Sequence, residues 1–126
     1  MQARPDFPGA LFNLANTLAQ AGRGAEAAAR YERLLQLTPD DVEARANYSA
    51  VLAGLGRDAA ALEQIREAVR RRPDHAALRN ACGVMLARAG RRREALAEFE
   101  AAVRLAPEQA DYRDNAARAA RAVDGR

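Results

Sequence analysis

Asparagine side chains recur at one interval along this chain and are its most promising binding groups. Asn13 and Asn47 are 34 residues apart, and Asn115 lies two further intervals on; Ala81 stands between them, with Asn80 beside it. A side-chain amide has donors and an acceptor, so it can pair with one peptide unit of an extended ligand. The series predicts amides that hold a polypeptide backbone. The alternative is that these amides bridge neighbouring helices.

Residue types that carry catalysis are scarce. His75 follows Pro73-Asp74 at a predicted helix start, so we expect it to cap that helix rather than act as a general base. Cys82 lies among apolar residues at helical spacing and is expected to be a buried thiol. It is the single cysteine, which excludes an intramolecular disulfide. Without a phosphate loop, metal-spaced cluster or acid–base pair, we predict no enzymatic activity and no cofactor or metal.

The charged residues are nearly balanced and interleaved. Twenty basic residues, all of them arginine, stand against 17 acidic ones, for a net charge of +3. We interpret the arginine and alanine content as the codon bias of a GC-rich bacterial genome. The runs 70–72 and 91–93 are expected to be solvated turn edges. An acidic partner or RNA is the alternative, and RNA affinity would fall steeply with salt.

The chain shows no sign of a membrane segment. No apolar run approaches the roughly 18 residues that would span a bilayer. Residues 1–5 lack the apolar stretch of a secretory signal. We therefore expect a cytoplasmic protein, or a piece of a longer one.

Two punctuation marks repeat every 34 residues and define the elements that must position the amides. Proline precedes an acidic residue at Pro5-Asp6, Pro39-Asp40, Pro73-Asp74 and Pro107-Glu108. Gly-Arg dipeptides run in phase at residues 22, 56 and 90, and at 125 with a shift of one. Glycine suits the left-handed turn after a first helix, and proline stops a second helix while the acidic side chain caps the next one.

Apolar residues between these marks have helical spacing. In the first helices they are Leu11, Leu14, Ala15 and Leu18, then Tyr48, Val51 and Leu52, then Cys82, Gly83 and Leu86. In the second helices they include Ala27, Tyr31 and Leu34, then Ala61, Ile65 and Ala68, then Ala95, Phe99 and Ala102. Two helices per period make a helical hairpin, and an alanine-rich chain without tryptophan fits all-α packing.

This pattern resembles the tetratricopeptide repeat. The residues that match are Leu11, Leu14-Ala15, Leu18, Ala27, Tyr31 and Pro39 in the first repeat, with corresponding residues in the next two. Arg45 and Arg79 depart from it, since a large apolar residue is usual there. The resemblance implies a single domain over 1–126, an α-solenoid with a right-handed superhelix. Its hairpins would cover about 8–41, 42–75 and 76–109, followed by a capping helix at about 110–122.

The resemblance also implies that first helices line a concave groove. The groove residues predicted to bind a peptide are Phe12, Asn13, Asn16, Gln20, Glu43, Asn47, Asn80, Val84, Arg88 and Asn115. Residues 5–15 and the spaced asparagines resemble the tetratricopeptide arm of O-GlcNAc transferases. The clamp with which chaperone-binding members hold a terminal carboxylate is not matched, because Phe12, Ala77 and Ala81 replace its three cations.

We therefore expect a protein–protein interaction module, an adaptor or scaffold that binds a peptide or partner protein in its groove. One alternative is the substrate-recognition arm of a larger enzyme such as a glycosyltransferase, which the downstream gene sequence would reveal. Another is self-association through unfinished repeat ends, which light scattering would detect. Neither a membrane nor nucleic acid is an expected partner.

Overall fold

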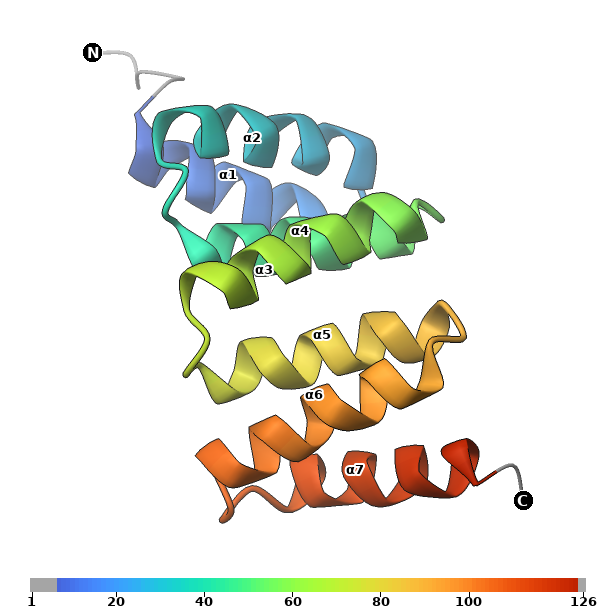
Figure 1. Ribbon diagram of the computed structural model, residues 1–126. Coiled ribbons are helices and arrows are strands. Elements are labelled where there is room, and N and C mark those ends of the chain that lie inside the picture. The colour runs from blue at the N-terminus through green and yellow to red at the C-terminus, as the bar shows by residue number, and fades with distance from the viewer. Residues whose placement is uncertain (1–6, 125–126) are drawn as a thin grey trace. The chain divides into compact units, whose positions relative to one another are not determined.

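The computed structural model describes residues 7–124, and within them the chain forms seven α-helices and no strand (Figure 1). Their bounds are α1 Pro8–Gln20, α2 Gly24–Leu37, α3 Val42–Gly54, α4 Asp58–Arg71, α5 Ala76–Arg88, α6 Arg92–Leu105 and α7 Ala110–Val123. The first helix of each period thus begins at residue 8, 42, 76 or 110. Pro5, Asp6 and the dipeptide at 125 lie outside the described residues.

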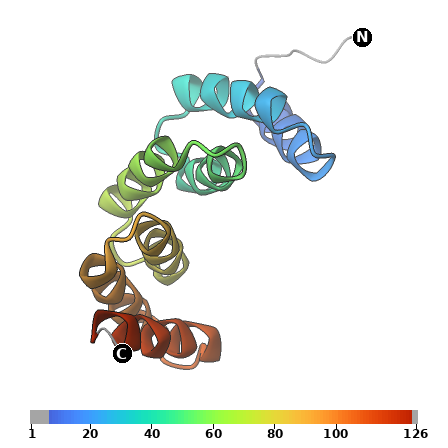
Figure 2. The ribbon, with the colours of Figure 1, turned by 90° about the vertical axis from the view of Figure 1, so that its right-hand side faces the viewer.

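The chain divides into two compact units, Met1–Gln64 and Ile65–Arg126, with the boundary inside α4. In the first unit α1 packs on α2, and both contact α3. In the second unit α6 packs between α5 and α7. Figure 2 shows the paired helices of α1 with α2 and of α5 with α6 nearly end on. None of the helices in the described range is long and apolar enough to cross a membrane.

The turns inside the hairpins follow the predicted glycines. Gly22, Gly56 and Gly90 have φ angles of 79°, 80° and 77°, a left-handed conformation that glycine adopts without steric cost. The amide after each glycine donates to a carbonyl five residues back, as from Arg23 to Leu18 at 2.9 Å. These are Schellman turns, which satisfy carbonyls at the helix end and send the chain directly into the second helix.

The prediction for the helix starts is wrong by one residue. The N-cap side chains are Asp41, which accepts a hydrogen bond from the Ala44 amide at 3.0 Å, and His75, which accepts from the Leu78 amide through Nδ1. Asp40 and Asp74 were expected in this role. They instead occupy the turn after proline, and the cap falls to the residue directly before the helix. The expectation that His75 is a capping residue is confirmed.

Small residues allow the two helices of each hairpin to approach closely. Ala27, Ala61 and Ala95 in the second helices are at most 1% exposed. Ala15, Ser49 and Gly83 occupy one shared position in the first helices and are all buried. The Ser49 hydroxyl donates to the Ala61 carbonyl oxygen at 2.7 Å, which satisfies the hydroxyl inside the core.

The two arginines that depart from the repeat pattern fasten the turns between hairpins. Arg45 donates to the Pro39 carbonyl oxygen at 2.9 Å and to Gln64 Oε1 at 2.9 Å. Arg79 donates likewise to the Pro73 carbonyl oxygen at 2.9 Å and to Glu98 Oε1 at 3.1 Å. Arg113, one period on, donates to the Pro107 carbonyl oxygen. A guanidinium has enough donors for both tasks, which an apolar side chain lacks.

Leu14 differs from the other apolar residues at its repeat position. Its side chain is 40% exposed, whereas Tyr48 and Cys82, one and two periods on, are 7% and 2% exposed. Tyr48 packs on Tyr31 with ring centroids 6.2 Å apart and donates to Glu32 at 3.0 Å. The expectation of a buried Leu14 is wrong, because the described chain places no preceding hairpin against α1.

We predict that Gly83→Ala destabilises the protein and that Gly54→Ala does not. A Cβ at Gly83 would lie 2.6 Å from Phe99 Cε1, whereas a Cβ at Gly54 meets nothing within 4 Å. Overpacking of this kind costs about 1–3 kcal/mol. Replacing glycine by alanine where space is open stabilises a helix by up to about 1 kcal/mol. Urea unfolding of the two variants checks this, and equal free energies of unfolding would contradict it.

Candidate functional site

The first unit has a shallow depression at the start of its first helices. It encloses ≈ 340 Å³ between α1, the end of α2 and the start of α3. Three predicted groove residues line it: Phe12, Asn13 and Glu43. Leu34 lies at its floor, and Phe12 is half-buried while the Asn13 amide is exposed. The depression therefore combines an aromatic wall with an accessible amide and a carboxylate.

A second depression of the first unit is lined by hydrogen-bonded amides. It encloses ≈ 300 Å³ and includes Asn16, Gln20, Tyr31 and Asn47. Asn47 Nδ2 donates to Asn16 Oδ1 at 3.2 Å, and the Tyr31 hydroxyl donates to the same oxygen. Burial raises the pKa of the Tyr31 phenol, and its hydrogen bond with Asn47 lowers the pKa in part. With its oxygen occupied by two donors, Asn16 keeps its Nδ2 hydrogens for another acceptor.

The second unit has a corresponding amide pair beside a more apolar depression. Asn115 Nδ2 donates to Asn80 Oδ1 at 3.0 Å, which joins α7 to α5. The depression encloses ≈ 320 Å³, and Val84, Arg88 and Asn115 line it. Its floor is Phe99 of α6, and its remaining lining comes mostly from alanines and from Arg118 of α7. Val84 is 37% exposed, so its apolar surface is available to a ligand.

The structure gives the predicted asparagine series two different roles. Asn47 and Asn115 each spend one donor on an asparagine of another first helix, which is the bridging role considered as an alternative. Asn13 is exposed beside the first depression. Nine of the ten predicted groove residues line a depression, and the tenth, Asn80, bonds to one that does. Peptide contact by these residues stays a prediction.

Sequence reasoning assigned the large residues of the second helices to packing alone. Tyr31 and Phe99 do pack inside their units, and each is also the floor of a depression between two first helices. Their spacing of two periods was the available signal. Since the first helices carry small residues where the second helix lies beneath them, an aromatic ring at this position reaches the surface between them.

Cys82 lacks the surroundings of a nucleophile. Its thiol is 2% exposed in the helical hairpin of α5 and α6, as expected. Burial raises the pKa of the thiol to about 11, and the negative charge of Glu98 adds to this. A reactive cysteine needs the opposite shift. Within residues 7–124, no three His, Cys, Asp or Glu side chains gather as a metal site would require.

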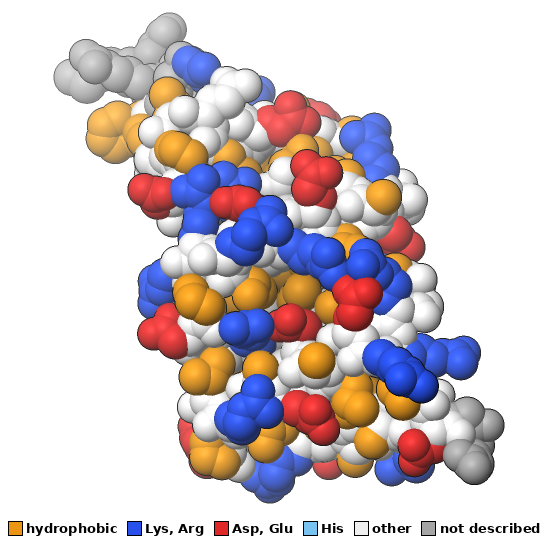
Figure 3. Space-filling model, in the orientation of Figure 1, with side chains coloured by type: hydrophobic (Ala, Val, Ile, Leu, Met, Phe, Trp, Pro, Cys, Tyr) orange, Lys and Arg blue, Asp and Glu red, His pale blue; other side chains and the backbone are white. Residues whose placement is uncertain are grey.

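The arginine runs are paired with glutamates on the helix surface. Arg70 and Arg71 both donate to Glu67, and these hydrogen bonds hold the pKa of that carboxyl below its usual value. Arg91 does the same for Glu94. Arginine and acidic side chains are interspersed on the face shown in Figure 3. This interleaving lacks the single-sign stripe that is typical of nucleic-acid interfaces.

The comparisons with known proteins agree on the architecture. A family model described as tetratricopeptide repeat matches residues 18–85, more than half of the chain. No curated protein matches the sequence. The structure of the first TPR of Spaghetti (RPAP3) bound to the HSP90 peptide SRMEEVD is similar, with a TM-score of 0.88 at 16% identity over 98% of each chain.

Two MamA structures are also similar. One crystal structure of MamA has a TM-score of 0.88 at 16% identity, over 95% of this chain and 70% of that one. MamA 41-end from Desulfovibrio magneticus RS-1 has a TM-score of 0.78 at 22% identity, over 92% and 71%. At these identities the likeness shows the fold alone.

Together the helices and turns define an all-α array of helical hairpins. The chain belongs to the tetratricopeptide repeat family, whose members are generally protein-interaction modules rather than enzymes. The resemblance to the arm of O-GlcNAc transferases stays a prediction.

We predict that Cys82 alkylates slowly in the folded protein. At pH 8 a thiol of pKa 9.0 is about one-tenth thiolate, and one of pKa about 11 is about one-thousandth thiolate. The rate with iodoacetamide should therefore be at least about a hundredfold lower in buffer than in urea, and should keep rising with pH up to about 11. Equal rates in the two conditions would contradict a buried thiol.

Proposed function

We propose that this protein is an adaptor or scaffold module that binds an extended peptide of a partner through its first helices. The observation that supports this most strongly is the position of the depressions. Each opens on first-helix residues, and each offers amide groups beside apolar surface. Recognition of peptides commonly combines hydrogen bonds to the backbone with recesses for side chains.

The amide cluster of the first unit suits a peptide backbone. Asn16 is oriented by Tyr31 and Asn47, so its donors point away from the cluster's internal hydrogen bonds. Asn47 keeps its oxygen and one N–H. A peptide unit needs one donor and one acceptor, and this pair supplies both. The similar Spaghetti structure, which is described as bound to a peptide, supports the same use of the fold.

Replacing two of these amides is expected to weaken peptide binding. Peptides selected from a random dodecapeptide display library should bind the Asn13→Ala, Asn47→Ala double variant about tenfold more weakly, since each lost hydrogen bond is worth about 0.5–1.5 kcal/mol. Fluorescence anisotropy measures the affinities. Asn13→Ala alone is informative because the exposed amide bonds to no described residue.

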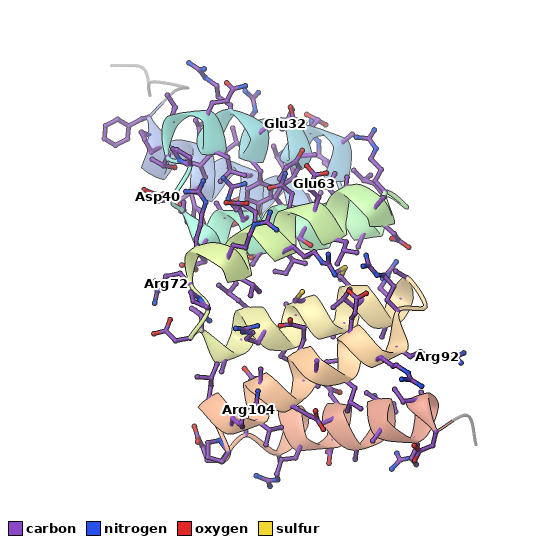
Figure 4. All side chains as sticks on the ribbon, in the orientation of Figure 1. Glu32, Asp40, Glu63, Arg72, Arg92 and Arg104 are labelled. Atoms are coloured by element: carbon purple, nitrogen blue, oxygen red, sulfur yellow. The ribbon has the colours of Figure 1, made fainter. Side chains whose placement is uncertain are left out.

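The control is Glu63→Ala, an exposed position on α4 that Figure 4 labels. It should leave the affinities unchanged. Unchanged affinity in the double variant, with its circular dichroism and melting temperature preserved, would remove the amides from the proposed site.

Self-association is a second candidate function, favoured by the surface of α1. This helix contains no ionisable residue, and Leu14 and Phe7 beside it are 40% and 61% exposed. Apolar surface without charge is typical of an interface. A second copy of the chain could cover it.

We predict that the protein forms a dimer or larger species as its concentration rises and that Leu14→Glu abolishes this. The new carboxylate would lie inside the apolar contact without a partner. Sedimentation velocity over a hundredfold range of concentration checks this. A wild-type protein that stays monomeric throughout would eliminate self-association through α1.

A further inference from the structure

Two depressions of the molecule occupy equivalent positions of the repeat. Asn16, Gln20 and Tyr31 line the amide depression of the first unit, and Val84, Arg88 and Phe99 stand two 34-residue periods later in the second. The other walls correspond too: Asn47 matches Asn115, and Ala50 matches Arg118. The same backbone geometry therefore carries two different linings.

The differences between the linings change what each depression can bind. At the first-unit position the side chains are an asparagine, a glutamine and a tyrosine hydroxyl. The second unit has an aliphatic side chain, an arginine and a phenylalanine ring in their place. A further arginine, Arg118, stands where the other depression has Ala50. The second unit thus exchanges neutral polar groups for an apolar floor and two cations.

The floor of the second-unit depression is held in place from below. Phe99 is buried against Gly83, whose missing side chain leaves room for the ring. Val84 adjoins this ring on the depression's wall, and Ala87, Ala119 and Ala122 contribute only methyl groups. A recess with a rigid aromatic floor and short walls is suited to an apolar side chain, because the ligand group can displace water from all of them.

The charges at this depression have one sign. Arg88 and Arg118 are its only ionisable lining residues, and both are exposed. Asp114, one turn before Arg118 on α7, does not line it. A guanidinium forms charge-assisted hydrogen bonds with carboxylates. An apolar floor between two arginines favours a ligand with an apolar group flanked by carboxylates over a nucleic-acid backbone, whose phosphates would leave the floor unused.

We propose that the second-unit depression is a specificity site, which takes an aliphatic side chain of a partner peptide while Arg88 and Arg118 bind acidic residues next to it. This deepens the proposed function and rests on it. The first unit would hold the backbone with its amides, whereas the second would select acidic peptides with an aliphatic residue.

The test uses a defined peptide and two sequence controls. The probe is fluorescein-labelled Ser-Glu-Glu-Leu-Glu-Glu-Ser with an amidated C-terminus, so that no terminal carboxylate takes part. In one control serine replaces leucine, and in the other glutamine replaces every glutamate. We expect wild-type protein to bind each control about tenfold more weakly than the probe by fluorescence anisotropy.

The protein variants exploit the repeat itself. Val84→Asn, Arg88→Gln and Arg118→Ala together give the second depression the residues of the first at these three positions. All three side chains are exposed, so the helices should keep their stability, which thermal melting verifies. Arg104→Ala, at the exposed end of α6 that Figure 4 labels, removes a positive charge outside the depression.

The triple variant should lose about tenfold in affinity for the probe and its preference over both controls, whereas Arg104→Ala keeps both. Failure of wild-type protein to prefer the probe, an unchanged triple variant, or stronger binding of labelled oligouridine than of the probe would overturn the specificity site. The amide variants tested with library peptides separate the two proposals. If they lose affinity while the triple variant does not, peptide binding stands and only this site falls.

Discussion

The close approach of the two helices in each hairpin is the constraint on which the rest of the structure depends. Ala27 and Ala95 are essentially inaccessible, and the facing first-helix position holds only alanine, serine or glycine. Because neither helix has bulk at the crossing, the large second-helix residue lies directly under the groove between first helices. The depressions that we assign to ligand binding exist for this reason.

The sequence predicts the punctuation of the fold well, since its physical causes are local. A left-handed turn needs glycine, and Gly22, Gly56 and Gly90 fulfil that need at the predicted residues. The start of a helix is less determined. Two acidic residues stand side by side at Asp40 and Asp41, and only the geometry of the turn selects the second as the cap.

The candidate site was only partly predictable because an amide's role depends on what lies opposite it. Position in the repeat places Asn47 and Asn115 near the groove, but it does not reveal that Asn16 and Asn80 are within hydrogen-bonding distance. The same limit applies to Arg45 and Arg79. They break the apolar pattern when it is considered alone, and only the folded chain shows the proline carbonyls that they meet.

The arginine fasteners have a consequence for how such a chain can change in length. Arg79 reaches six residues back to Pro73 and nineteen forward to Glu98, so its bonds span fewer residues than one repeat contains. Arg45 spans the same two distances. A gene duplication or deletion of one whole period would therefore copy or remove each fastener together with both of its acceptors. Arrays of different lengths could arise from this unit without leaving a buried guanidinium stranded.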